Sequence, residues 1–149
     1  MQDKVVFGMT VGLLADGVKL LVNYLGYVLN FADKVFWQIV ASRFLEKHLL
    51  HRPVAYLVGG IADLTVAGFL GVAFVYLLTF TGWRYIYIKG CGFAILVWVY
   101  LFGSLLSQST HGPLTPSALV VTALAHFVFG LALAFFAVKL RKTGRQSID

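Results

Sequence analysis

The chain has 149 residues, of which 60% are hydrophobic and 12% are charged, and its mean hydropathy is +0.86. Soluble domains carry about 25% charged residues, so the composition excludes an ordinary soluble protein and predicts a single membrane domain over residues 1–149. The net charge of +6 does not indicate nucleic-acid binding, because the only dense basic run directly follows an apolar segment and is typical of a membrane anchor.

The first predicted span covers residues 5–29 and is almost wholly apolar. A helix of this length extends about 37 Å, enough to cross a hydrocarbon core of about 30 Å. Asp16, Lys19 and Asn23 lie three and four residues apart near its middle, so they share one helical face. A charge at mid-bilayer costs about 2.5–3.5 kcal/mol on insertion scales, so we expect this face to meet other helices.

Residues 31–51 are predicted to form an amphipathic helix in the membrane interface. Apolar residues recur at helical spacing on one side of it, and charged residues occupy the rest. This helix either caps the bundle or acts as a lid over a cavity or a docking surface for a protein partner. His48 and His51 lie near its end without a third ligand of the usual kind, so no metal site is predicted there.

The second predicted span covers residues 54–78, and Asp63 is its only ionisable group. Gly59 and Gly60 precede Asp63 and are the predicted place for a break in this helix, as in transporters with discontinuous helices. Small residues also allow close helix packing in membranes. The glycines predicted to serve this packing are Gly8, Gly12, Gly59, Gly60, Gly68 and Gly71.

Two further spans are predicted at residues 88–106 and 117–140, and His126 lies near the middle of the last. The expected fold is therefore all-α: a polytopic bundle of four transmembrane helices, with the interfacial helix between the first two spans.

An even number of spans places both termini on one side of the membrane. Cytoplasmic segments carry an excess of Lys and Arg, and the side of the termini has more of them, so the termini are predicted to be cytoplasmic. The side of the termini carries Lys4, Arg84, Lys89, Lys139, Arg141, Lys142 and Arg145, and the other side carries Lys34, Arg43, Lys47 and Arg52.

Three ionisable residues inside the spans share one depth. Counted from the side opposite the termini, Lys19, Asp63 and His126 lie about 13–15 Å deep, and Asp16 lies one turn nearer the side of the termini. We therefore predict a buried polar cluster of Asp16, Lys19, Asn23, Asp63 and His126. It is neutral if His126 is protonated and carries one negative charge otherwise, so it is suited to take up a proton or a cation. A purely structural ion pair that fixes the register of the helices is the alternative.

Two stretches resemble a known family. The stretch from Gly8 to Lys19, and the Leu114-Thr115-Pro116 turn leading into Ala125-His-Phe-Val-Phe-Gly130, resemble the small, uncharacterised YagU-like inner-membrane proteins of bacteria. The resemblance covers the first and fourth spans, and the chain lacks the longer external segments of that group. It implies a location in the bacterial cytoplasmic membrane and implies no catalytic or binding residues.

The polar cluster favours a small channel or a proton- or cation-linked transporter. We expect a homo-oligomer in the lipid bilayer, because four short helices enclose little volume alone. The alternative is a structural or accessory subunit of a larger membrane complex. An enzyme is not expected, since the sequence shows no nucleophile motif, phosphate-binding glycine loop or three-ligand metal set, and no cofactor is predicted.

Overall fold

The computed structural model describes residues 3–105 and 114–146, and its described part is helical without strands. The elements are α1 (Lys4–Val28), α2 (Phe36–Ala41), the 3-10 turn η1 (Lys47–Leu49), α3 (Pro53–Thr81), α4 (Ile86–Tyr100), the π-helical turn η2 (Leu101–Leu105) and α5 (Pro116–Gln146). Four segments are long and apolar enough to cross a membrane: α1, α3, α4 with η2 as far as Ser104, and α5 as far as Lys142. The predicted all-α, four-helix membrane bundle is therefore confirmed.

Local chemistry explains where the long helices begin. Asp3 caps α1, because its Oδ1 accepts hydrogen bonds from the backbone N–H groups of Val5 (2.7 Å) and Val6 (3.3 Å). α3 and α5 each begin at a proline, Pro53 and Pro116, which suits a first helical turn where an N–H is not needed. The predicted end of the third span at residue 106 and the side chain of Arg145 lie outside the described residues.

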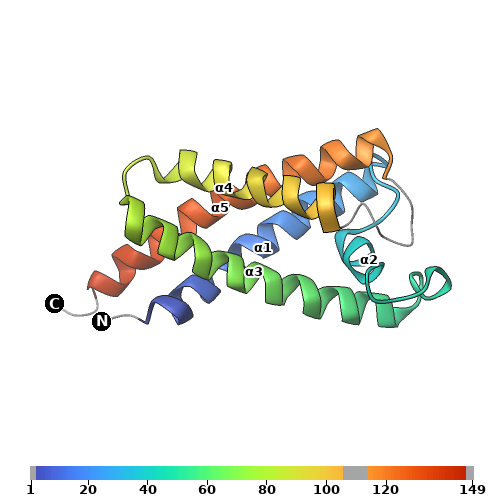
Figure 1. Cartoon of the computed structure of the whole chain (residues 1–149), viewed down its shortest axis with the longest axis horizontal. Coiled ribbons are helices and arrows are strands. Elements are labelled where there is room, and N and C mark those ends of the chain that lie inside the picture. Colours follow the sequence, from blue (N-terminus) through green and yellow to red (C-terminus); the bar gives the residue numbers. More distant parts are fainter. Residues whose placement is uncertain (1–2, 106–113, 147–149) are drawn as a thin grey trace.

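The long helices pack in the order α3, α1, α5, α4, with α1 and α5 at the centre (Figure 1). α3 and α4 are consecutive in sequence but touch each other little. Both termini and the α3–α4 connection lie at one end of the bundle, which we call the terminal end. α2 and η1 lie at the opposite end, which we call the loop end.

The distribution of polar and apolar side chains is the reverse of that in a soluble protein. Asp16, Asn23 and Thr122 are buried, whereas Leu57 and Leu96 on the outer faces of α3 and α4 are 64% and 69% exposed. Polar groups inside and apolar groups outside are what a bilayer requires of a multi-pass protein, since hydrocarbon cannot satisfy polar groups.

Glycines form the contact between α1 and α3. A Cβ atom at Gly12 would overlap the carbonyl oxygen of Ala67, and one at Gly71 would overlap that of Gly8. Gly60 and Gly68 differ from the other predicted packing glycines: a Cβ at Gly68 would meet only the tip of Met9 at 3.8 Å, and one at Gly60 only the ring of Trp37 at 3.4–3.5 Å, both ordinary contacts. Backbone therefore touches backbone along this seam.

A second glycine contact was not predicted from the sequence. Gly90 of α4 and Gly130 of α5 face each other, and a Cβ on either would overlap the other's carbonyl oxygen. Each glycine has an alanine four residues later, Ala94 and Ala134, so the small-xxx-small spacing was present in the sequence.

The segment between α1 and α3 differs from its prediction. Helical structure within residues 31–51 is confined to α2 and η1, so a single helix over this range is wrong in extent. Asn23 of α1 accepts a hydrogen bond from the backbone N–H of Phe36 (2.7 Å), and Trp37 packs on Gly59 and Gly60. These contacts draw the start of α2 into the bundle, where Phe36 is 2% exposed. α3 runs unbroken through both glycines.

Candidate functional site

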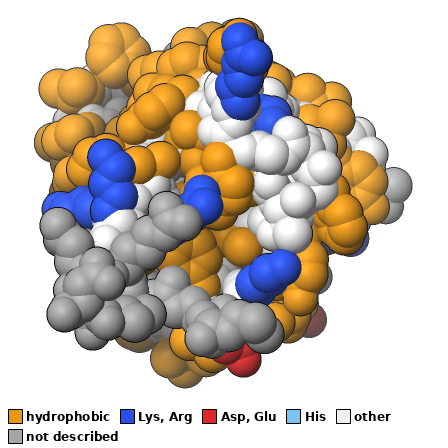
Figure 2. Space-filling model, turned by 90° about the vertical axis from the view of Figure 1, so that its left-hand side faces the viewer, with side chains coloured by type: hydrophobic (Ala, Val, Ile, Leu, Met, Phe, Trp, Pro, Cys, Tyr) orange, Lys and Arg blue, Asp and Glu red, His pale blue; other side chains and the backbone are white. Residues whose placement is uncertain are grey.

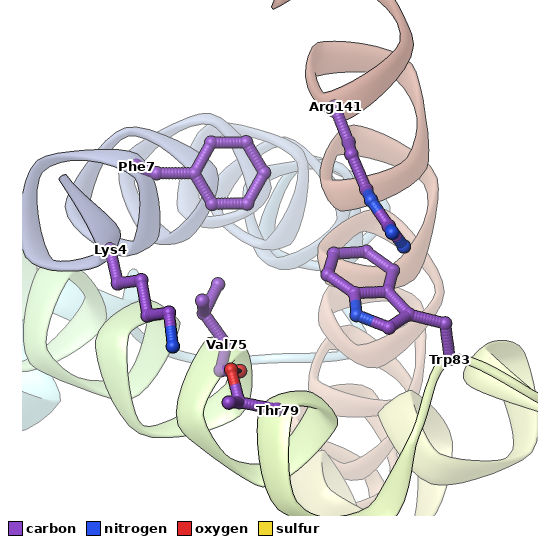
Figure 3. Close-up of a pocket in the computed structure, with 6 residues that line it drawn as sticks. All are labelled: Lys4, Phe7, Val75, Thr79, Trp83 and Arg141. Atoms are coloured by element: carbon purple, nitrogen blue, oxygen red, sulfur yellow. Dashed lines mark hydrogen bonds between the residues drawn. The ribbon is translucent and has the colours of Figure 1, made fainter. Parts of the chain in front are cut away.

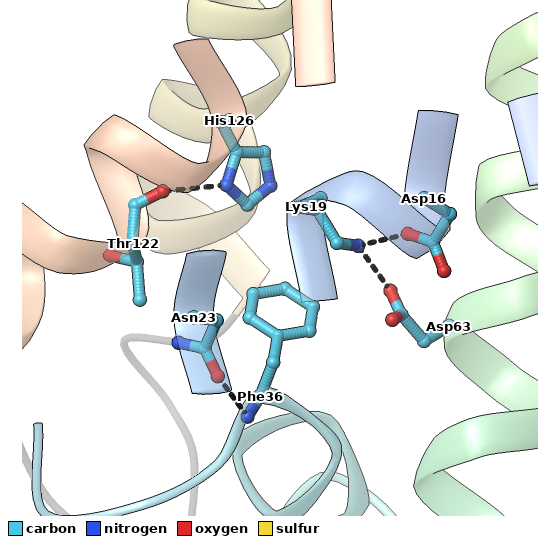
Figure 4. A network of polar contacts seen from close by, with 7 residues as sticks. All are labelled: Asp16, Lys19, Asn23, Phe36, Asp63, Thr122 and His126. Atoms are coloured by element: carbon cyan, nitrogen blue, oxygen red, sulfur yellow. Dashed lines mark hydrogen bonds and ion pairs between the residues drawn. The ribbon is translucent and has the colours of Figure 1, made fainter. Parts of the chain in front are cut away.

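Lys19 lies between two aspartates at the centre of the bundle (Figure 4). Its Nζ is 2.6 Å from Oδ1 of Asp16, one turn earlier on α1, and 2.7 Å from Oδ1 of Asp63 on α3. All three side chains are at most 5% exposed. We call these three residues the ion triad.

The fold explains why these three residues meet. Asp16 and Lys19 are three apart and share a helical face. Asp63 reaches them from α3 because the glycine seam, one turn nearer the terminal end at Gly12 of α1 and Ala67 of α3, brings the two backbones into contact. A wider spacing between α1 and α3 would leave Asp63 beyond the reach of the lysine.

The ion triad has one acid more than it has bases. In their charged forms, two carboxylates and one ammonium carry a net charge of −1. Oδ2 of Asp16 and Oδ2 of Asp63 are buried without a hydrogen-bond partner among the described residues. Oδ1 of Asp16 contacts Lys19 as an ion pair but lacks the geometry of a hydrogen bond. Buried polar groups of this kind are normally satisfied, so the triad retains capacity to bind a cation, a proton or water.

Phe36 closes the triad toward the loop end. Its ring centroid lies 4.2 Å from Nζ of Lys19, the distance of a cation–π contact, and Phe129 of α5 contributes a second at 5.8 Å. Asn23 lies beside Phe36, because its side-chain oxygen accepts the hydrogen bond from the Phe36 backbone. The Nδ2 of Asn23 has no partner among the described residues. Phe36 was not among the predicted site residues, because it comes from a loop-end segment whose depth in the membrane cannot be read from residue spacing.

His126 lies beside the Phe36 ring and forms no ion pair with either aspartate. Its Nδ1 donates to the backbone carbonyl of Thr122 (2.8 Å), one turn earlier on α5. The imidazole packs against the rings of Phe36 (5.6 Å between centroids) and Phe102 (5.9 Å). Phe102 reaches it from the π-helical turn η2, and such turns are frequent at functional sites.

The five predicted cluster residues thus divide into two groups. The structure brings Asp16, Lys19 and Asp63 into direct contact. Asn23 and His126 are buried beside them, at 1% and 2% exposure, but bond to backbone groups instead.

A cavity of about 320 Å³ lies beside Asp63, between α2, α3 and η2. Its lining runs from the exposed Arg43 and Phe44 at the loop end past Phe36 and Asp63 to the exposed Val66 on α3. A second cavity of about 290 Å³ on the other side of α2 is lined by Asn23 and again by Phe36. Phe36 is therefore shared by both cavities and by the ion triad.

The terminal end is closed in a different way. Val11, Ala15, Phe74 and Leu78 lie between the triad and that end, and each is completely buried. Together with the glycine seam they separate the triad from the side of the termini.

Metal binding finds no support among the described residues, which contain no group of three His, Cys, Asp or Glu side chains. His48, one of the two histidines considered above, pairs with Glu46 (3.3 Å), and both side chains are exposed.

Comparison of the chain with protein-family models, with curated proteins and with solved structures gives no match.

Proposed function

We propose that this chain is a small channel or transporter that carries protons or monovalent cations, and that the ion triad is its binding site. The observation that carries the proposal is the surplus acid: Lys19 lies between two buried aspartates, and no second base pairs with them among the described residues. An uncompensated charge at this depth is costly, so uptake of a proton or a cation stabilises the site.

The cavity beside Asp63 supports the same proposal. It gives a route from the exposed Arg43 and Phe44 to a carboxylate of the triad. The opposite side is sealed by apolar side chains and by the glycine seam. A site reached from one side at a time is what alternating access requires, and Phe36 is positioned to act as the gate on the open side.

Purified protein reconstituted into vesicles that contain a pH-sensitive dye would test this function. We expect the wild type to pass protons under an imposed membrane potential, and Asp63→Asn and Lys19→Met to abolish the flux because each removes one charge of the triad. A parallel series with sodium- and potassium-sensitive dyes distinguishes protons from cations.

Asp33→Asn is the matched control, because Asp33 is a half-exposed acid at the loop end that pairs with Lys34 (3.1 Å). Its flux should equal that of the wild type. A wild type without flux, or Asp63→Asn and Lys19→Met variants with wild-type flux, would contradict the proposal. Each variant is compared only after circular dichroism and gel filtration show that it folds as the wild type does.

A structural or accessory subunit is the second candidate. The observation that favours it is that α3 and α4 touch each other little, so we propose their facing sides as the place where a helix of a partner or of a second copy packs. Purification from native membranes separates the two candidates: a stoichiometric second protein supports the accessory role, and a monodisperse homo-oligomer weakens it.

We further propose a location in the bacterial cytoplasmic membrane with both termini in the cytoplasm. The resemblance to bacterial inner-membrane proteins supports the location, and the excess of Lys and Arg at the terminal end supports the orientation. In this orientation the cavity beside Asp63 opens away from the cytoplasm.

A further inference from the structure

A pocket of about 320 Å³ lies at the terminal end, remote from the ion triad. It forms where the ends of α1, α3 and α5 meet the α3–α4 connection (Figure 3). Its lining consists of Lys4, Phe7, Val75, Thr79, Trp83 and Arg141.

Two cations border this pocket, and no acid among the residues that the structure describes pairs with either of them. Lys4 and Arg141 lie on opposite sides of it, and neither forms an ion pair with a residue that the structure describes. The guanidinium of Arg141 lies over the ring of Trp83, 4.0 Å from its centroid, which orients its donors. Asp3 is the acid described at this end, and its Oδ1 is occupied by the backbone of α1.

The surroundings add further positive charge. Figure 2 looks at the terminal end and shows Lys and Arg side chains distributed over it. The Lys and Arg residues at this end whose side chains the structure describes are Lys4, Arg84, Lys89, Lys139, Arg141 and Lys142. Lys89 is already engaged, because its Nζ donates to the carbonyls of Thr81 and Gly82 at the end of α3. The pocket thus lies in a field that attracts anions.

The position of the pocket indicates which kind of anion it binds. Its residues come from the start of α1, the ends of α3 and α5 and the α3–α4 connection. In a bilayer this end of the bundle lies near the depth of the headgroups, where Trp83 is typical. Phe7 and Val75 form an apolar wall beside the two cations (Figure 3). A phosphate with hydrocarbon attached satisfies both parts of the pocket, whereas a free anion satisfies only the charges.

We propose that this pocket binds the phosphate of an anionic phospholipid, with Lys4 and Arg141 contacting the phosphate oxygens and Phe7 and Val75 contacting the first part of the acyl chains. Arg is suited to this role because its planar fork matches the geometry of phosphate.

The test uses the full chain in a nonionic detergent, titrated with phosphatidylglycerol or with phosphatidylcholine, and native mass spectrometry counts the bound lipid. We expect phosphatidylglycerol to bind more tightly. The double variant Lys4→Gln/Arg141→Gln should weaken its binding about 30-fold, which is about 2 kcal/mol at 1.4 kcal/mol per factor of ten. Arg84→Gln/Lys142→Gln is the matched control, because it removes one Arg and one exposed Lys at the same end outside the pocket.

Three results would overturn the proposal: equal binding of the two lipids, equal loss of affinity in the control variant, or displacement of phosphatidylglycerol by inorganic phosphate at a similar concentration. The last result would assign the pocket to a free anion. The single variants Lys4→Gln and Arg141→Gln provide the same comparison if the double variant does not fold, each with an expected loss of about fivefold.

Discussion

Replacing Lys19 with methionine tests the charge balance of the ion triad most directly. The two Oδ1 atoms lie 2.6 Å and 2.7 Å from Nζ, so they are separated by no more than the sum, 5.3 Å. Two unit charges at that separation repel by about 3 kcal/mol at an effective dielectric constant of about 20. Removing one partner of a buried ion pair costs about 3–5 kcal/mol, so we expect Lys19→Met to lower the free energy of unfolding by about that amount.

Removing one acid of the ion triad should cost less stability than removing the lysine. Asp16→Asn or Asp63→Asn leaves one carboxylate opposite one ammonium, a neutral pair that keeps a charge-assisted contact to Lys19. Each variant should therefore lose less stability than Lys19→Met, because it leaves a neutral site and because it deletes one ion pair where the lysine variant deletes two. The ranking of the three variants follows from the net charge of the site together with the number of ion pairs lost.

The assay is reversible unfolding in mixed detergent micelles, followed by circular dichroism. Lys34→Met is the matched control, because Lys34 forms a partly exposed pair with Asp33 at the loop end and such pairs contribute about 0–1 kcal/mol. A loss in Asp16→Asn and Asp63→Asn as large as that in Lys19→Met would refute the surplus of negative charge, and with it the reason for proposing a proton or cation site.

Three further predictions use the same assay. Gly12→Ala should destabilise the protein by about 1–3 kcal/mol, because the added Cβ overlaps the backbone of α3. Gly17→Ala should leave stability unchanged or raise it, because a Cβ there meets nothing within 4 Å. Equal effects of the two substitutions would argue against close packing of α1 on α3. Lys89→Met should cost about 0.3–1 kcal/mol, because Lys89 donates to carbonyls at the C-terminal end of α3, and no loss would show that water replaces it. Trp98→Phe removes the hydrogen bond from the indole Nε1 to the Thr122 hydroxyl (3.1 Å) between α4 and α5. We expect the free energy of unfolding to fall by about 0.6 kcal/mol, and a fall above about 2 kcal/mol would indicate that Trp98 acts through packing instead.

The sequence was sufficient for the architecture because bilayer physics leaves few choices. Four long apolar stretches must be helices, since a lipid environment requires every backbone group to be bonded within its own segment. The spacing of Asp16 and Lys19 also fixes their shared face without knowledge of any other helix. These properties are local, and local patterns are readable from one sequence.

Relations between helices were harder to predict for a physical reason. Residue counting gave His126 and Asp63 the same depth, but depth does not determine the rotation of a helix about its axis. In the structure the ring of Phe36 lies against both Lys19 and the imidazole of His126. Phe36 comes from a segment that amphipathic spacing assigns to the membrane interface, and tertiary contacts bring it inside: its own bond to Asn23 and the packing of Trp37 on Gly59 and Gly60.

The glycine seam and the ion triad act on the same contact, so ligand binding and helix packing are coupled in the proposed function. The seam holds α3 at the one register in which Asp63 meets Lys19 across 2.7 Å. A shift of α3 by one turn, about 5.4 Å, would take Asp63 out of reach. Conversely, a proton or cation taken up by Asp63 weakens its attraction to the lysine and removes an interaction that opposes such a shift. Site occupancy thereby biases the packing of α1 against α3, and this packing also closes the route to the terminal end.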